Sequence, residues 1–358
     1  MNRTLWRHWL SPSHASSVAF PRRRRRELHR VAACGGVTLA LLAGFQLTDS
    51  ARAATADAYP ARPIRLVVPF APGGNADIQG RYMAEKLTGA LGKQVVVDNR
   101  PGANAIIGTA LVAQAPADGH TLLLVAPGHA INPGLVSKLP YDTLKDLRGV
   151  SLIGSTPLLF VAHPGVPANS VKELIALAKG RPGALNFGSS GNGSPANLAG
   201  ALLNVMAGIN LVHVPYKATA QATLDVIGGQ IQLAFPSLTS VLPHVKARRL
   251  KAYSITTERR SPLAPDLPTM AEAGVPGYQA SIWNGLLVPA GTPKPIVTRL
   301  NQAVVDLLKS PEARDRYAAV GAEVLYSSPA EFDAFIRSEM TKWAKVIRVA
   351  GIRIDLAR

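Results

Sequence analysis

The chain has 358 residues, of which 47% are apolar and 17% are charged. This composition is typical of a globular protein with room for two domains, and it excludes a disordered chain. The single cysteine, Cys34, excludes a disulfide framework and a cysteine-based zinc site. The net charge of +17 does not indicate a nucleic-acid partner, because nine arginines lie in the first 53 residues and the rest of the chain has no basic run longer than two.

The first 53 residues have the order of an export signal. A run of five arginines at 22–26 precedes an uncharged apolar stretch at 31–47, and the small-x-small sequence Ala51-Arg52-Ala53 follows. A basic region, an apolar region and a cleavage site in this order predict a secretory leader that is removed before Ala54. A retained N-terminal membrane anchor is the alternative, and the export route, Sec or twin-arginine, stays open.

After the leader, segments typical of strands and of helices alternate. Apolar and β-branched runs predict strands at 64–69, 94–97, 121–125, 157–162, 184–187, 211–214, 231–235, 250–255 and 282–288. Helical spacing and caps predict helices across 78–87, at 104–114, at 170–180, from 194, and after the Ser/Thr-Pro pairs at 292–293, 310–311 and 328–329. This alternation predicts an α/β fold of two mostly parallel sheets, each of roughly four or five strands and flanked by helices.

Two glycine-rich loops carry the most informative chemistry. Residues 68–77 (VPFAPGGNAD) and 188–194 (GSSGNGS) each follow a strand and lead into a helix. Such loops offer backbone N–H groups and the positive end of a helix dipole, so we expect them to bind an anion. A single anion held between the two loops would contact both of them. Neither loop matches a nucleotide or dinucleotide motif, which leaves a small carboxylate as the simplest ligand. The alternative is that both loops are only tight turns with helix caps.

Signals for catalysis are weak. The nucleophile motif Gly-x-Ser-x-Gly is absent, and no histidine can be tied by sequence to Ser189 or Ser190. His129 follows a strand and is a candidate for the cleft wall, whereas Asp77 is expected to be a structural acid in the first turn of a helix. No histidine pair has metal-ligand spacing. We therefore predict no catalytic residue, no metal and no cofactor.

Short motifs in one fixed order resemble the Bug family, the substrate-binding receptors of tripartite tricarboxylate transporters. The motifs run through most of the chain after the leader: PARPI at 60–64, VPFAPGG at 68–74, DNRPGA at 98–103, ADGHTLL at 117–123, FGSSGNGS at 187–194, HVPYK at 213–217, LPHVK at 242–246, PDLPT at 265–269 and PAGTP at 289–293. Each motif is weak alone, but the ordered set is specific.

The resemblance implies a two-domain clamshell receptor of the periplasm. One domain comprises residues 54–157 plus 281–358, and the other comprises residues 158–280. The expected ligand is a small carboxylate, and the expected partners are membrane transporter subunits or a sensor kinase; the receptor itself is expected to be a monomer. The ligand-binding residues that the resemblance implies, together with His129 from the argument above, are Phe70, Ala71, Pro72, Gly73, Gly74, Asp77, Ser189, Ser190, Asn192, Gly193, Lys217, Ala218 and Thr219.

The chain departs from the family pattern at three positions. Ala218 stands where a glycine is usual, Asn197 where a histidine is common, and Pro236 where many members have an aspartate. Loss of that aspartate removes a partner for a ligand amine, so a plain mono- or dicarboxylate is favoured over an amino acid. Two other functions stay open from the sequence: a ligand sensor for a membrane histidine kinase, and a periplasmic enzyme that uses a serine or His129 of the cleft.

Overall fold

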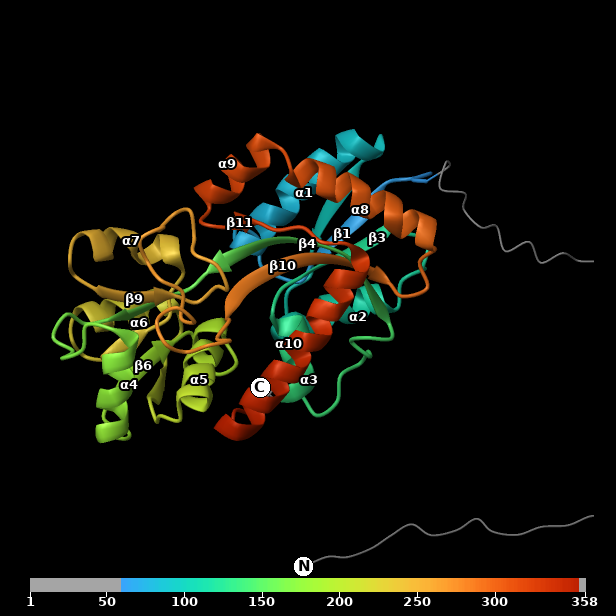
Figure 1. The fold of residues 1–358 in the computed structure, drawn as a ribbon. Coiled ribbons are helices and arrows are strands. Elements are labelled where there is room, and N and C mark those ends of the chain that lie inside the picture. Colours follow the sequence, from blue (N-terminus) through green and yellow to red (C-terminus); the bar gives the residue numbers. More distant parts are fainter. Residues whose placement is uncertain (1–58, 354–358) are drawn as a thin grey trace, which may run out of the picture. The chain divides into compact units, whose positions relative to one another are not determined.

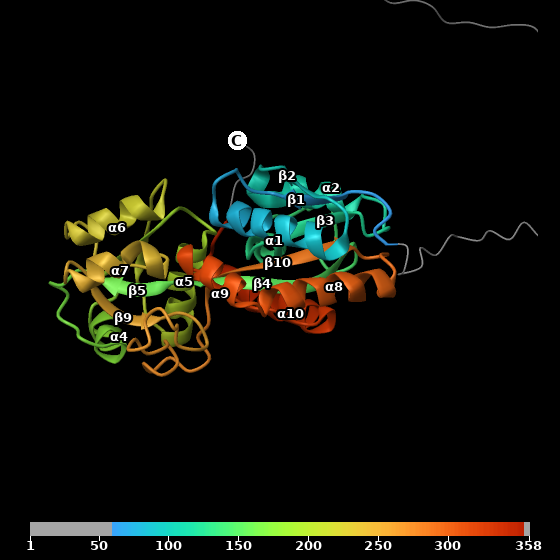
Figure 2. The same ribbon diagram turned by 90° about the horizontal axis from the view of Figure 1, so that it is seen from above.

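The computed structural model describes residues 59–353, and the predicted leader lies outside this range. The described residues form two sheets flanked by helices (Figures 1 and 2). Among the helices that are described, none is both long and apolar enough to span a bilayer.

The first sheet has six strands in the order β11-β4-β10-β3-β1-β2. Strand β1 is parallel to β2 and β3, whereas β10 is antiparallel to β3 and β4, and β11 is antiparallel to β4. Four strands therefore point one way, as the sequence predicts for a mostly parallel sheet. The strands are β1 (Ile64–Val68), β2 (Val95–Asn99), β3 (Thr121–Val125), β4 (Leu147–Pro157), β10 (Ser281–Pro289) and β11 (Glu323–Val324).

Helices cover both faces of the first sheet. Leu66 and Val68 of β1 pack in a cluster with α1 (Asn75–Leu91), α8 (Lys294–Leu308) and α9 (Pro311–Ala319). Val67 packs on the opposite face with residues of α2 (Ile106–Ala113), α3 (Gly128–Leu135) and α10 (Pro329–Ala350). Successive side chains of a strand point to opposite faces, so a strand between two helix layers is apolar throughout.

The second sheet has five strands in the order β7-β6-β8-β5-β9, and only β5 runs against the others. Its strands are β5 (Leu159–Ala162), β6 (Asn186–Ser189), β7 (Val212–Pro215), β8 (Leu233–Ala234) and β9 (Lys251–Ile255). Helices α4 (Val171–Gly180) and α5 (Pro195–Ala207) cover one face, and α6 (Thr219–Ile227) and α7 (Leu238–Lys246) cover the other.

The chain passes between the sheets at two neighbouring places. Strand β4 ends at Pro157 and β5 begins at Leu159, while Ser281, the first residue of β10, pairs with Pro157. The long helix α10 packs on α3 and also on α5 beside the second sheet (Figure 1). Trp343, Ile347 and their neighbours consequently share one apolar cluster with the α5 face of the second sheet.

The expected strands are present, with ends that differ by at most two residues, but β4 and β11 were not predicted. Strand β4 contains Gly149 and Gly154, which weaken a strand signal. Both glycines make room for packing: a Cβ on Gly154 would lie 2.5 Å from the Tyr317 ring, and one on Gly149 would lie 3.2 Å from the Phe332 ring. Helices α3, α6 and α7 were not predicted either. In α3 and α7 the helical signal is interrupted by a proline, Pro133 and Pro243.

Glu339 joins α10 to the strand that returns from the second sheet. Its buried carboxylate accepts hydrogen bonds from the indole N–H groups of Trp283 on β10, at 3.0 Å, and of Trp343, at 2.9 Å. Lys342 forms an ion pair with the same carboxylate. One acceptor therefore satisfies two buried donors that have no access to water.

We expect Glu339→Ala to lower the free energy of unfolding by about 3 kcal/mol, because two buried indole N–H groups lose their acceptor. Glu339→Gln keeps one acceptor oxygen, so this variant should lower the free energy of unfolding by only about 1 kcal/mol. Urea unfolding of the three proteins measures both losses. A loss below about 0.5 kcal/mol for Glu339→Ala would contradict this role.

Candidate ligand-binding site

Loops of both sheets meet at a pocket of about 320 Å³. Three loops come from the first sheet and follow the carboxyl ends of β1, β2 and β3, while the loop from the second sheet follows β6. Ligands of open α/β sheets bind at this edge. The lining residues are Phe70, Asn104, Ala105, Ala126, Pro127, Gly128, Ile131, Ser190, Asn192, Gly193, Ser194, Pro195 and Ile282.

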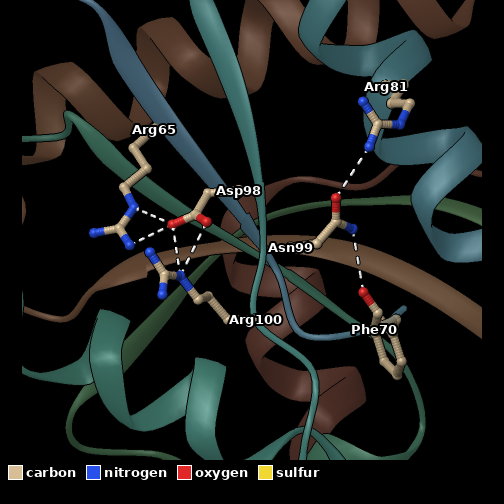
Figure 3. Close-up of polar contacts among 6 residues, drawn as sticks. All are labelled: Arg65, Phe70, Arg81, Asp98, Asn99 and Arg100. Carbon is tan, nitrogen blue, oxygen red and sulfur yellow. Dashed lines mark hydrogen bonds and ion pairs between the residues drawn. The ribbon is translucent and has the colours of Figure 1, made fainter. Parts of the chain in front are cut away.

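The carboxylate of Asp77 fixes the first glycine loop. Asp77 accepts hydrogen bonds from the Gly73 N–H at 2.9 Å, from Arg81 Nε at 2.9 Å and from Asn99 Nδ2 at 2.8 Å. Asn99 Nδ2 also donates to the Phe70 carbonyl at 3.1 Å, and Arg81 donates to Asn99 Oδ1 at 3.0 Å (Figure 3). Gly73 has a φ of +83°, which favours glycine. The network thus holds Phe70 at the pocket wall.

Hydrogen bonds lower the pKa of Asp77. Burial alone would raise the pKa, but the bonds from Arg81, Gly73 and Asn99 outweigh burial and hold the pKa below its usual value. Asp77 is therefore ionised at neutral pH, and its negative charge belongs to the loop scaffold.

The second glycine loop uses the same device with an uncharged side chain. The Gly193 N–H donates to Asn197 Oδ1 at 3.0 Å, again four residues further on, and Gly193 has a φ of +73°. Ser194 caps α5 by accepting a hydrogen bond from the Asn197 N–H at 3.3 Å. Each loop is therefore tied to the first turn of the helix that follows it.

Ser189 lies behind the second loop and is fully buried. Its Oγ is 2.6 Å from His213 Nε2 and exchanges two hydrogen bonds of 3.1 Å with the backbone of Gly191. Burial lowers the pKa of His213, which favours the neutral imidazole. Ser189 thus anchors the loop at its base, and it is absent from the pocket lining.

The arginines beside the first sheet are engaged in ion pairs. On β2, Asp98 pairs with Arg65 and Arg100 (Figure 3). Arg81 pairs with Asp77. None of the lining residues is ionisable in the part of the chain that the structure describes. An anion in the pocket would consequently be held by hydroxyl, amide and backbone N–H donors.

Four of the residues that the sequence proposes as ligand-binding lie together in the pocket lining: Phe70, Ser190, Asn192 and Gly193. The others lie outside this lining. Asp77 and Ser189 are buried behind their loops, whereas Ala71, Pro72, Gly73, Gly74, Lys217 and Ala218 are exposed and Thr219 begins α6.

His129 does not lie in the pocket lining; it is buried in α3, where its ring stacks on Tyr141 with the ring centroids 6.4 Å apart. Neither ring nitrogen has a hydrogen-bond partner within residues 59–353. Desolvation lowers the pKa of His129 to about 4, so the ring is neutral at pH 7.

Sequence reasoning missed the loop after β2, and from the segment after β3 it proposed only His129, not the residues that line the pocket. Asn104 and Ala105 follow β2, and Ala126, Pro127 and Gly128 follow β3. The signal was present, because both loops leave the carboxyl ends of parallel strands beside β1. Asn104 was instead predicted to begin a helix that starts at Ile106 in the structure.

No group of three or more potential metal ligands occurs among residues 59–353.

Two helix-flanked sheets whose loops share one pocket are the architecture of a periplasmic binding protein. The family model of the tripartite tricarboxylate transporter family receptor matches residues 80–352. Protein BugT of Bordetella pertussis is 38% identical over 302 residues, which cover 84% of this chain and 93% of that protein. The chain therefore belongs to the tripartite tricarboxylate transporter receptor family, which confirms the resemblance seen in the sequence.

Solved structures agree with this assignment. Rpa4515 of R. palustris, solved with adipate, has 36% sequence identity and a TM-score of 0.67, and the match covers 83% of this chain and 100% of that one. MatC from Rhodopseudomonas palustris, solved with bound malate, has 32% identity and a TM-score of 0.64, with coverage of 81% and 100%. The periplasmic binding protein BugD has 35% identity and a TM-score of 0.64, with coverage of 83% and 100%.

Replacement of Asp77 by asparagine should lower stability in a pH-dependent way. Because the folded-state pKa lies below the usual value, the charged form stabilises the fold above that usual value, and the benefit is lost as the pH falls through the lowered pKa. We expect wild type to exceed Asp77→Asn by about 1 kcal/mol at pH 7 and to lose this advantage in acid. Urea unfolding of both proteins between pH 7 and pH 2 tests this; a difference that is independent of pH would contradict it.

Proposed function

We propose that this receptor is periplasmic and captures a small carboxylate in the pocket between the two sheets, for delivery to the membrane subunits of a tripartite tricarboxylate transporter. The observation that carries the proposal is the pocket itself. It joins loops from both sheets, and its second-sheet side bears Ser190, Asn192 and Ser194. Side-chain hydroxyl and amide groups there are suited to a carboxylate.

The hydroxyl of Ser194 is available as a donor. Its oxygen accepts the hydrogen bond from the Asn197 N–H, and a hydroxyl that accepts in this way keeps its proton for another partner. The solved relatives support the ligand class, because Rpa4515 was solved with adipate and MatC with malate. The periplasmic assignment is supported by BugD and by the leader pattern of residues 1–53.

We place the two domains at residues 54–157 plus 281–358 and at residues 158–280. The described strands of the first sheet lie in the first set of residues and those of the second sheet lie in the second set, which supports these bounds. A ligand that contacts both domains stabilises the arrangement in which both sets of loops reach it. The remaining residues that the sequence proposes, in the first glycine loop and at 217–219, are candidates for contacts made in that arrangement.

We propose that binding is not followed by a chemical step and that the receptor acts as a monomer. The contact between Ser189 and His213 is the feature most like a nucleophile–base pair in the described residues, but Ser189 is fully buried and lies outside the pocket lining. A nucleophile must reach the substrate, so this geometry favours a structural role for the pair.

The first test is a thermal-shift screen of purified protein, refolded from denaturant, against small mono- and dicarboxylates and amino acids. A ligand at 100 times its Kd should stabilise the protein by about 2.7 kcal/mol. Mass spectrometry of the recovered ligand should show it unchanged. A chemically altered ligand would indicate an enzyme, and no stabilisation by any carboxylate would contradict a carboxylate receptor.

A pair of variants tests the pocket. Ser190→Ala and Asn192→Ala each remove a donor from the lining, and each should raise the Kd of the identified ligand about tenfold. Ser338→Ala, which removes an exposed hydroxyl on α10, is the matched control and should leave the Kd unchanged. Isothermal titration calorimetry measures all four proteins. Unchanged affinity in both pocket variants would mean that the ligand binds elsewhere.

A further inference from the structure

Helices and loops that flank the two sheets also touch at a place away from the ligand pocket. Gly321 lies in the turn between α9 and β11, and Thr239 lies in the first turn of α7 beside the second sheet. A Cβ on Gly321 would lie 2.2 Å from Thr239 Oγ1 and 2.8 Å from Thr239 Cβ. Because the second distance does not depend on the rotamer of Thr239, only a residue without a side chain fits at this position. We call the contact between Gly321 and Thr239 the back contact.

A cavity of about 410 Å³ lies beside the back contact. Pro262 and Leu263, in the loop after β9, form one wall, and Ala322 and Val324, which follow Gly321, belong to the other. Protein interiors are normally close-packed, so these two walls are not pressed together along their whole length. The back contact consequently limits how near the two walls can come.

The sheet order places the back contact and the ligand pocket on opposite sides of the strands that join the sheets (Figures 1 and 2). In the first sheet, β3, β1 and β2 lie on one side of β4 and β10, and β11 lies on the other. In the second sheet, β8 and β6 lie on one side of β5, and β9 lies on the other. The pocket joins the loops after β1, β2 and β3 to the loop after β6, whereas the back contact joins the turn before β11 to the helix that precedes β9.

A hinge rotation about the joining strands therefore moves the two places in opposite senses. When the loops of the pocket come together, the turn at Gly321 and α7 move apart, and when the pocket opens, they approach each other. In the structure they are so close that a methyl group on Gly321 would overlap Thr239. The degree of opening that the pocket has here thus requires a glycine at position 321.

We propose that Gly321 sets the balance between open and closed arrangements of the receptor from a place that the ligand does not touch. A side chain at position 321 would hold the walls of the back contact apart and favour closure of the pocket. The apparent Kd equals the intrinsic Kd divided by the fraction of binding-competent protein, so a larger closed fraction tightens binding. The affinity part of this inference rests on the proposed function, but the conformational part does not.

The first test measures affinity in two alanine variants. Gly321→Ala should lower the Kd about threefold, because the added Cβ disfavours the open arrangement. Gly92→Ala is the matched control, since Gly92 has a similar φ, +70° against +72°, but its Cβ would meet nothing within 4 Å. It should leave the Kd unchanged. Isothermal titration calorimetry with adipate, with malate and with each acid that stabilises the protein in the thermal-shift screen measures the three proteins.

A compensating variant separates the back contact from a local distortion of the turn. Thr239→Gly removes the three side-chain atoms that the new Cβ would meet. The Kd of the double variant Gly321→Ala, Thr239→Gly should therefore return to the wild-type value, although the backbone strain at position 321 is still present.

The second test needs no ligand. Nitroxide labels on Ile107→Cys in α2 and Leu224→Cys in α6 report the distance between the two sheets' helices by pulsed electron resonance (Figure 2). Both native side chains are exposed, at 55% and 62%, and Cys34→Ser removes the only other cysteine of the full chain. In the absence of ligand, Gly321→Ala should shift the distances to shorter values, and Gly92→Ala should not.

The outcomes distinguish this inference from the proposed function. Unchanged distances in Gly321→Ala, longer distances, or weaker binding would overturn the role of the back contact and leave the proposed function standing. Equal effects of Gly321→Ala and Gly92→Ala would also overturn it, because backbone strain alone would then be the cause. Shorter distances in Gly321→Ala with no binding of any acid tested would support the back contact and overturn the proposed function.

Discussion

The candidate site depends on one repeated interaction, a side chain that bonds back to the N–H of a glycine four residues earlier. Asp77 holds Gly73 and Asn197 holds Gly193, at 2.9 and 3.0 Å. Each bond fixes a loop against the first turn of the following helix, and both glycines have positive φ values that most residues avoid. The loops therefore keep their shape without a ligand, and less conformational entropy is lost when one binds.

These side-chain hydrogen bonds also engage backbone N–H donors that the sequence analysis expects to be free to bind an anion. The Gly73 N–H is bonded to an ionised carboxylate, and the nearby Arg81 is paired with the same group. The first loop consequently brings a compensated negative charge close to the site. The loop after β6 differs, because Asn197 is neutral and the polar groups of Ser190, Asn192 and Ser194 lie in the pocket lining. The second sheet is thus the better electrostatic environment for a carboxylate.

The sequence predicts the fold well where local signals agree with tertiary packing. Strand β3 (Thr121–Val125) and the capped start of α10 at Ser328 match their predictions, because a buried apolar run and a capping box act locally. Strand β4 was missed because its glycines serve the Tyr317 and Phe332 rings, which are more than 160 residues away in the chain. The site shows the same limit. The second glycine loop, residues 188–194, supplies four lining residues, but Asn104 belongs to the site only because β2 lies beside β1 and its turn is held by Asn132.

The residues that stabilise the fold differ from those that line the ligand pocket. Both faces of β1 are covered by apolar clusters, which fix where the strand ends lie, while the residues that face the ligand stand on loops beyond those ends. A loop residue such as Asn104 can then change the polarity of the pocket without disturbing either cluster. This explains in physical terms how Rpa4515 and MatC, solved with adipate and with malate, share one architecture with this chain at 36% and 32% identity. The turn at 103–105 has three successive positive φ values, and its two hydrogen bonds with Asn132 hold this strained backbone in place.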